Sequence, residues 1–139
     1  MKISISRIYV DDQDKALEFY TNKLGFIKKV DISNNGYRWL TVVSPEEENG
    51  VELLLESNEN PAAKTYQEAM FQQDWAATVF TTEDIKTEHE KLVARGVEFK
   101  LEPTDIGPTI MATLNDTCGN LIQINQMKKS TSELEASYE

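Results

Sequence analysis

The chain contains one pattern of secondary structure twice. Residues 8–26 read as a short apolar strand, an acidic corner, an amphipathic helix and a Leu-Gly-Phe exit into a second strand. Residues 79–99 repeat this order in a weaker form. Since the same sequence of signals favours the same local structure, the repeat predicts two equivalent halves, each built from strands around one helix.

Helix and turn signals give the order of elements in the first half. After a strand that ends at Val10, an acidic cap at Asp12 or Asp14 starts a helix, and Gly25 ends it. The apolar stripe that should pack this helix on the sheet consists of Ala16, Leu17, Tyr20 and Leu24. The three strands that follow are predicted at residues 26–32, 37–43 and 51–56, with a tight hairpin at residues 34–36.

The second half is predicted to have the same order after a linker at residues 57–61 and a short helix at residues 62–71. Glu83 or Asp84 opens its main helix and Gly96 closes it. Its strands are predicted at residues 75–82, 97–101, 109–114 and 121–127, with a loop at residues 103–108 that either forms a lip over the site or is only a connection. Residues 128–139 are charged and Ser-rich, which predicts a flexible polar tail.

The charge balance limits the partners. The chain has 139 residues, 14 basic and 24 acidic, and its net charge of −10 argues against nucleic acid or anionic lipid. The excess of acidic residues either keeps the protein soluble or attracts a cationic ligand. No apolar run is long enough for a membrane span, and the N-terminus lacks the pattern of a secretory signal, so we expect a cytoplasmic protein. The single cysteine, Cys118, excludes an intramolecular disulfide and is expected to be a spectator.

Two βαβββ units with these residues resemble a known family. The residues concerned are Asp12, Ala16-Leu17, Phe19-Tyr20, Leu24-Gly25-Phe26, then Asp84-Ile85, Gly96-Val97-Glu98-Phe99 and Gly119-Asn120-Leu121-Ile122. This pattern is similar to that of the vicinal oxygen chelate superfamily, which includes glyoxalase I, bleomycin resistance proteins and extradiol dioxygenases. The resemblance implies an α+β fold in which two βαβββ modules, at residues 3–56 and 75–127 of a single domain over 1–127, form a curled mixed sheet around a cavity.

The resemblance also implies where a metal would bind. Family enzymes hold a divalent ion through four side chains, one from the first and one from the last strand of each half. Carried over by the repeat, these positions are Ile5, Glu52, Ala77 and Gln123. Two of them are hydrocarbon, whereas a catalytic metal typically needs three or more O, N or S ligands. We therefore expect no cofactor, with a divalent metal as the minority possibility; His89 lies on the second helix, where packing or solvent is expected.

Strand alternation suggests which side chains line the cavity. Arg7 and Tyr9 share the face of Ile5. Arg7 and Glu52 are expected to face each other, either as a structural ion pair or as an anion-binding group beside a base. Trp39 is a stacking wall if its face is concave, and a cover for a helix if it is convex. Met111 and Thr113, or instead Ile110 and Leu114, complete the lining together with Gln123.

These residues support two functions and exclude a third. The first is a metal-independent protein that resembles the bleomycin resistance group and binds a small aromatic or cationic molecule through Arg7, Tyr9, Trp39, Glu52, Met111 and Gln123. In that group the unit is a homodimer, whose halves pair within one chain or swap between two. The alternative is a glyoxalase-type lyase or isomerase with Glu52 as general base. A dioxygenase needs two histidines and a carboxylate around iron, and the chain has one histidine.

Overall fold

The structure is a computed structural model that describes residues 1–128. The predicted tail at residues 128–139 lies outside the described residues except for Lys128. The first half consists of β1 (Ile5–Val10), α1 (Gln13–Glu18), the π-helical turn η1 (Phe19–Lys23), β2 (Ile27–Asn34), β3 (Tyr37–Val43) and β4 (Glu52–Ser57). After the connecting helix α2 (Pro61–Gln72), the second half consists of β5 (Ala76–Thr81), α3 (Ile85–Ala94), β6 (Glu98–Asp105), β7 (Thr109–Asn115) and β8 (Leu121–Met127).

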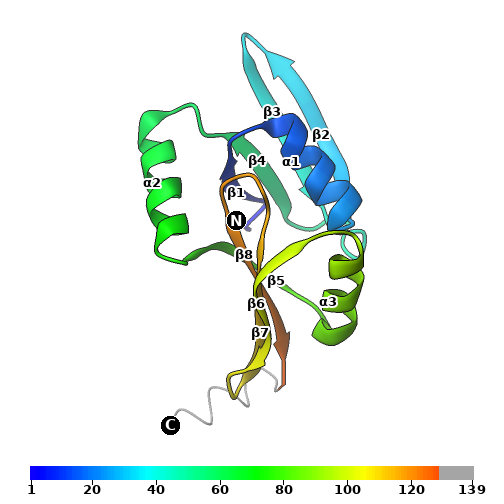
Figure 1. The fold of residues 1–139 in the computed structure, drawn as a ribbon. Coiled ribbons are helices and arrows are strands. Elements are labelled where there is room, and N and C mark those ends of the chain that lie inside the picture. The colour runs from blue at the N-terminus through cyan, green and yellow to red at the C-terminus, as the bar shows by residue number, and fades with distance from the viewer. Residues whose placement is uncertain (129–139) are drawn as a thin grey trace.

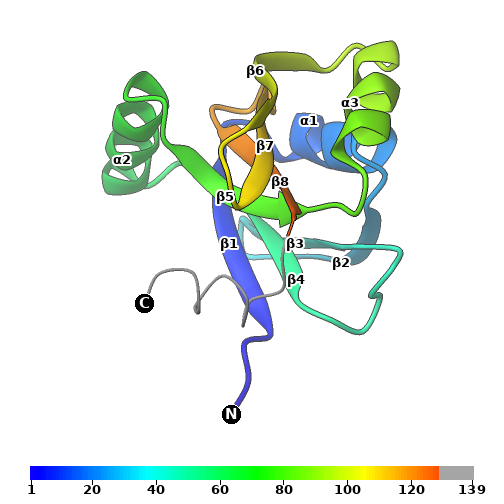
Figure 2. The same ribbon diagram turned by 90° about the horizontal axis from the view of Figure 1, so that it is seen from below.

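Each half forms its own four-stranded sheet, and the two sheets have the same topology. The strand orders are β1-β4-β3-β2 and β5-β8-β7-β6. In each sheet the first and last strands of the half pair in parallel and the other neighbours are antiparallel. The helix α2 lies on one side of the molecule, and α1 and α3 lie on the other (Figures 1 and 2). The predicted α+β fold of two βαβββ units is confirmed, and the sheets do not close into a barrel.

The two main helices begin and end at equivalent residues. Asp12 and Asp84 each accept a hydrogen bond at 3.1 Å from the backbone N–H three residues later, which satisfies a free donor of the first turn. Gly25 and Gly96 both have φ near +86°, a left-handed conformation that glycine adopts without strain. The caps are therefore Asp12 and Asp84, while Asp14 and Glu83 of the predicted pairs are not.

The core lies between the sheets and the helices α1 and α3. Its buried side chains from the strands are Ile8, Val10, Leu40, Val42, Leu53, Leu55, Ala112, Leu114, Ile122 and Ile124. From the helices come Ala16, Phe19, Tyr20, Ile85 and Leu92. Because side chains alternate along a strand, burial of these residues leaves the opposite set of side chains on the other face of each sheet.

One predicted connection is shorter in the structure. Residues 103–105, predicted as part of a loop, belong to β6, which pairs Thr104 with Met111 and Asp105 with Ile110. The register shifts between Leu101 and Thr104, and Pro103 lies in that irregular stretch. A proline has no N–H to donate, and strands accommodate it at such bulges. The loop is therefore only the turn at residues 106–108, closed by the Ile106 N–H donating to the Thr109 carbonyl at 3.0 Å.

The turn between β7 and β8 joins the second half to the first. The Asp11 N–H donates to the Cys118 carbonyl at 3.1 Å, and the Asn120 amide donates to the Tyr9 carbonyl at 2.7 Å. Gln67 of α2 donates to the Tyr9 and Cys118 carbonyls at 2.9 and 3.1 Å. The halves are thus connected by hydrogen bonds as well as by apolar packing. Within residues 1–128, no helix is long and apolar enough to cross a membrane.

Candidate functional site

The first sheet has one face that no helix of its own half covers, which we call the open face. Its members from β3 and β4 are identified by mutual contacts: the Tyr37 hydroxyl donates to Glu56 at 2.9 Å, and the Thr41 hydroxyl donates to Glu52 at 2.7 Å. Alternation adds Trp39, because its neighbour Leu40 is in the core. From β1, Ile5, Arg7 and Tyr9 lie opposite Glu52, Leu54 and Glu56 in register. The open face therefore consists of Ile5, Arg7, Tyr9, Tyr37, Trp39, Thr41, Glu52, Leu54 and Glu56, of which Thr41 and Leu54 are fully buried beneath their neighbours.

Arg7 forms its ion pair with a different glutamate from the one predicted. Its Nε lies 3.3 Å from Oε2 of Glu56, and the predicted facing pair of Arg7 and Glu52 does not form. The reason is the parallel register, which places Arg7 beside Leu54, between the two glutamates. Burial and the hydrogen bond to Glu56 raise the pKa of Tyr37, so its hydroxyl stays protonated and donates. Arg7 remains half exposed and available to a ligand.

Glu52 is held in place by Thr41 and lies directly opposite Ile5 on β1. Its carboxylate is half buried and keeps one oxygen for a further contact, since Thr41 binds Oε1. No basic side chain among residues 1–128 forms an ion pair with it. Chemically, this arrangement provides an oriented acceptor or base on a face that is otherwise hydrocarbon at this level.

The corresponding face of the second sheet carries Gln123 and Met111. Gln123 donates to Asn125 at 2.8 Å. It pairs in register with Thr113 of β7, two residues from Met111, while Ala112 and Leu114 point into the core. Of the two alternatives for the lining, Met111 and Thr113 therefore share the face of Gln123, and Ile110 packs against the core instead.

The strand register also identifies the residue opposite Gln123. It is Val79, because β5 has an irregularity between Ala76 and Thr78. Ala77 falls at this irregularity and lines a small cleft of about 90 Å³ beside α2, together with Arg7 and Tyr9. The expected metal position on β5 is Ala77 if it is counted from the helix cap and Val79 if it is read from the strand register. Both side chains are hydrocarbon, so neither residue can ligate a metal.

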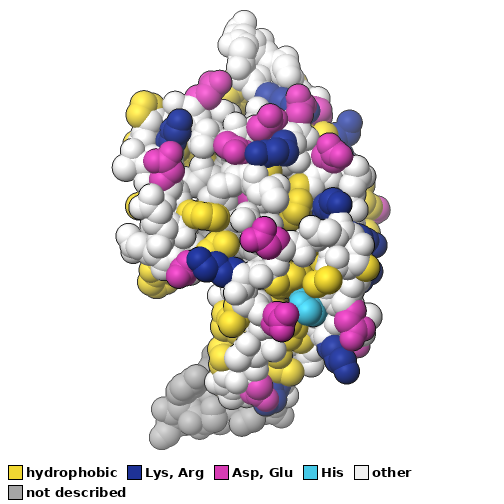
Figure 3. All heavy atoms as spheres, viewed as in Figure 1, with side chains coloured by type: hydrophobic (Ala, Val, Ile, Leu, Met, Phe, Trp, Pro, Cys, Tyr) yellow, Lys and Arg dark blue, Asp and Glu magenta, His cyan; other side chains and the backbone are white. Residues whose placement is uncertain are grey.

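The described residues contain no group of three or more His, Cys, Asp and Glu side chains that could hold a metal ion. The single histidine, His89, packs edge-on against Phe99, with ring centroids 4.5 Å apart, and Figure 3 shows a histidine at the surface beside hydrophobic side chains. Cys118 is buried, and burial raises the pKa of its thiol to about 12. Because the thiolate is the reactive form, both the burial and the raised pKa disfavour a role as nucleophile.

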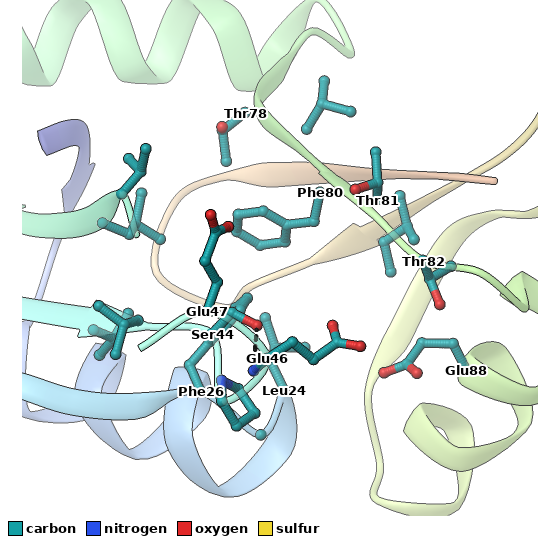
Figure 4. Close-up of a pocket in the computed structure, with 18 of the residues that line it drawn as sticks. Leu24, Phe26, Ser44, Glu46, Glu47, Thr78, Phe80, Thr81, Thr82 and Glu88 are labelled. Atoms are coloured by element: carbon teal, nitrogen blue, oxygen red, sulfur yellow. Dashed lines mark hydrogen bonds between the residues drawn. The ribbon is translucent and has the colours of Figure 1, made fainter. Parts of the chain in front are cut away.

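A large cavity lies elsewhere, between the two halves. It has a volume of about 1090 Å³ and is bordered by the β3–β4 loop, by β5 and by α3. Phe26 and Phe80 contribute aromatic rings, and Val42 and Leu53 contribute aliphatic side chains. Figure 4 shows Glu46 and Glu47 on one wall and Thr82 and Glu88 on the other.

Sequence reasoning did not find this cavity. None of Arg7, Tyr9, Trp39, Glu52, Met111 and Gln123 lines it. One signal is present in the sequence, the acidic run Glu46 to Glu48, but such a run is also typical of a solvated loop. The cavity depends on how the two halves are oriented, and strand and helix periodicity contain no information about that orientation.

Comparison with known proteins identifies relatives over nearly the whole chain. A family model described as "Glyoxalase/Bleomycin resistance protein/Dioxygenase superfamily" matches residues 2–124. The uncharacterized protein YurT of Bacillus subtilis (strain 168) is 54% identical over 126 residues, which is 91% of this chain and 99% of that protein. YetH of the same organism, also uncharacterized, is 30% identical over 90% of this chain and 98% of its own length.

Solved structures show the same fold. The crystal structure of UcmS2 has a TM-score of 0.79 and 30% identity, covering 90% of this chain and 97% of that one. The structure of TnmS3, described as an antibiotic binding protein from Streptomyces sp. CB03234, has a TM-score of 0.73 and covers 92% of this chain and 97% of that one. Its identity of 24% extends the likeness to the fold alone.

Proposed function

This chain belongs to the glyoxalase/bleomycin resistance protein/dioxygenase superfamily, and from that premise we propose that it is a metal-independent member that binds a small aromatic or cationic molecule. The ligand lies on the open face of the first sheet and on the corresponding face of the second. A superfamily contains many chemistries on one fold, and the side chains at the site decide which of them a member performs.

The observation that carries this proposal is the pair of hydrocarbon side chains at the metal positions. Ile5 lies opposite Glu52, and Val79 lies opposite Gln123, with Ala77 at the irregularity beside it. A divalent ion here would have one carboxylate and one neutral amide oxygen from the protein, and the remainder of its ligands would be water. Such an ion is too weakly held for Lewis-acid catalysis, which depends on a fixed coordination geometry.

The open face offers groups for recognition in place of a metal. Trp39 presents an indole ring, which stacks on flat ligands and attracts cations. Arg7, Glu56 and Tyr37 form a hydrogen-bonded chain that is partly open to solvent. A half-exposed guanidinium binds an anionic group of a ligand, and the glutamates on either side of it accept from N–H donors. This set suits a ligand with an aromatic body and polar substituents.

A second copy of the chain completes this site in our proposal. β1 and β5 are outer strands of their sheets, and within the described chain the side chains of Gln67 and Asn120 bond the β1 edge only at Tyr9. Ile5, Tyr37 and Val79 are 36%, 46% and 48% exposed, although they are large and apolar. A homodimer that covers these side chains would enclose the ligand. Light scattering at micromolar concentration tests this assembly, and a monomer there would contradict it.

One observation favours a second candidate function, a glyoxalase-type lyase or isomerase. The hydrogen bond from Thr41 orients the Glu52 carboxylate, as a general base requires. The two candidates are separated by the variant Glu52→Gln. A binding protein keeps its ligand affinity within a few-fold, since an amide oxygen still accepts. A lyase loses turnover of the glutathione conjugate of methylglyoxal.

The proposal is tested by ligand binding with a local reporter. A thermal-shift screen against planar aromatic amines and antibiotics finds binders, and tryptophan fluorescence then locates them. The chain has two tryptophans, so Trp39→Phe should abolish ligand-induced quenching and Trp75→Phe should preserve it. If no compound raises the melting temperature with or without added divalent metal, or if Trp75→Phe alone removes the signal, the open-face proposal is wrong.

A further inference from the structure

We propose that the cavity between the two halves is a separate binding site for an organic cation with a flat apolar body. The cavity has a volume of about 1090 Å³, at the upper end of the range of small-molecule pockets. It lies apart from Trp39, Arg7 and Glu52, none of which lines it. The inference is therefore independent of the function proposed for the open face.

The inner wall of the cavity selects for an apolar aromatic body. Phe80 packs edge-to-face against Phe26 with ring centroids 5.1 Å apart, and both rings line the cavity. Behind the rings, Val42 and Leu53 of the first sheet and Leu92 of α3 are 1%, 9% and 1% exposed, so they support the wall and the two rings form its accessible part. These side chains belong to different elements that are already packed into the core, so the wall is preformed. When a flat hydrocarbon ligand binds this wall, its surface is removed from water and the protein does not have to rearrange.

The mouth of the cavity selects for positive charge. Glu47 points inward beside the Phe80 ring, and Glu46 extends toward Glu88 on the opposite wall (Figure 4). The negative charges of Glu46 and Glu47 attract a cation that enters between the loop and α3. Within residues 1–128, neither Glu46 nor Glu47 forms an ion pair.

The basic side chains at the cavity are engaged with the protein. Lys91 lies 3.5 Å from Glu88 on the same helix, and Arg95 donates to the Lys23 carbonyl at 2.9 Å. Both side chains are therefore held at the α3 wall, although Arg95 keeps its positive charge, and neither forms an ion pair with the two carboxylates of the loop. An anionic ligand would meet two like charges at the entrance, whereas a cation meets two of opposite sign.

The β3–β4 loop is folded in a way that directs these carboxylates. Ser44 accepts from the Glu46 N–H at 3.1 Å, and the Gly50 N–H donates to the Glu47 carbonyl at 3.0 Å. A side chain at Gly50 would begin 2.5 Å from Cγ of Glu47. Glycine at this position thus leaves room for the stem of Glu47, and the carboxylate continues into the cavity.

The test uses a matched pair of probes at pH 8, 9-aminoacridine, which is a planar cation, and acridine, which is a neutral molecule with the same ring system. Binding is followed by probe fluorescence with the full-length chain. We expect 9-aminoacridine to bind at least several-fold more tightly than acridine. The double variant Glu46→Gln/Glu47→Gln should weaken the cation about five- to tenfold, the size expected from two partly exposed charges, and leave acridine unchanged.

The control removes the same charge away from the cavity. Glu48 of the same loop and Glu59 after β4 are both exposed and do not line the cavity, so Glu48→Gln/Glu59→Gln should preserve affinity. A loss equal to that of the first pair would mean a general effect of net charge and would overturn the proposal. Val51→Trp fills the cavity from an exposed position and should block both probes. Absence of binding, or binding that disappears in Trp39→Phe but not in Val51→Trp, would also overturn it.

Discussion

The Tyr20 hydroxyl donates a 2.7 Å hydrogen bond to Oδ2 of Asp116, a residue 96 positions away in the other half of the chain. Both side chains are fully buried. Asp116 also accepts from the backbone N–H groups of Cys118 and Asn120 and from the Asn120 amide, at 2.7–3.0 Å. Burial raises the pKa of Asp116 and raises that of Tyr20 even more. This pair connects η1, the turn directly after α1, to the turn before β8.

Removal of the Tyr20 hydroxyl should lower the free energy of unfolding and leave the fold unchanged. Tyr20→Phe keeps the ring that stacks with Phe26 and deletes one donor to a buried carboxylate, so we expect a loss of about 1–3 kcal/mol in the free energy of unfolding. Urea denaturation measures it. Tyr66→Phe on the exposed side of α2 is the control and should change little. Equal effects of the two variants would contradict a specific bond between the halves.

The close contact between Gly119 and Gln67 gives a second prediction. A Cβ at Gly119 would lie 2.6 Å from the Gln67 amide nitrogen, which donates to the Tyr9 and Cys118 carbonyls. Gly107 has a similarly positive φ but nothing within 4 Å. Both Gly→Ala variants carry the backbone strain, about 1 kcal/mol, and only Gly119→Ala also displaces Gln67.

Thermal denaturation compares the two variants directly. We expect Gly119→Ala to lose about 1–3 kcal/mol more than Gly107→Ala, since the Gln67 amide is buried and loses its partners. If the two variants melt at the same temperature, Gln67 moves without cost and does not hold α2 against the turn.

Acid should weaken one ion pair of the first half. Nε and Nη2 of Arg38 donate to the two oxygens of Asp31 at 2.9 and 3.0 Å, and Nη1 donates to Asp14 at 2.6 Å. The hydrogen bonds from Arg38 lower the pKa of Asp31 below its ordinary value of 3.8. A lowered pKa in the folded state means that this stabilisation is present above pH 3.8 and is lost as pH falls through the folded value.

The variant Arg38→Gln isolates this contribution. Because the side chains are partly exposed, the wild type should exceed it by only about 1 kcal/mol at pH 7, and the difference should shrink below about pH 4. Urea denaturation from neutral to strongly acidic pH measures the difference. Lys64→Gln on α2, which removes a charge elsewhere, should differ from the wild type by an amount that does not change with pH. If the difference in free energy of unfolding for Arg38→Gln is also constant with pH, the ion pair between Arg38 and Asp31 does not contribute as stated.

Chelation should leave the protein unchanged. With Ile5 and Val79 opposite Glu52 and Gln123, protein purified without chelator should contain less than stoichiometric divalent ion by elemental analysis. EDTA should leave the melting temperature unchanged, and millimolar Zn²⁺, Ni²⁺ or Mn²⁺ should not raise it, since only a ligand that binds the folded state stabilises it. One equivalent of metal that disappears in Glu52→Gln would refute the metal-independent proposal.

The fold could be predicted because its signals are local. Asp12 and Asp84 cap equivalent helices, Gly25 and Gly96 end them, and the turn at Asn35-Gly36 joins two strands with positive φ at both residues. Each of these signals acts over a few residues. Alternation along a strand is equally local, and along β3 it separates Trp39 from the core residues Leu40 and Val42.

The contacts within the site could be predicted only in part from the sequence, because they depend on strand register and on the packing of the two halves. Arg7 was expected to face Glu52, but the parallel register places it opposite Leu54, and it pairs with Glu56 on the same face. In β5 the irregularity adds one residue between Ala76 and Thr78, so Val79 stands opposite Gln123 where the count from the helix cap gives Ala77. Strand alternation shows which residues share a face, but it does not show which residue of the neighbouring strand lies opposite. The cavity near Phe80 arises from packing of the halves, which depends on contacts remote in sequence.

The hydrogen bond between Tyr20 and Asp116 has a consequence for biosynthesis. Contacts between residues so far apart slow folding, because a long loop has to close before they form. On the ribosome, a nascent chain that has reached only residue 115 holds β1 and α1 without the carboxylate that Tyr20 binds. The first βαβββ unit therefore gains this hydrogen bond only when translation has passed the turn before the last strand. Until then the Tyr20 hydroxyl has no partner in the chain and has to bond to water.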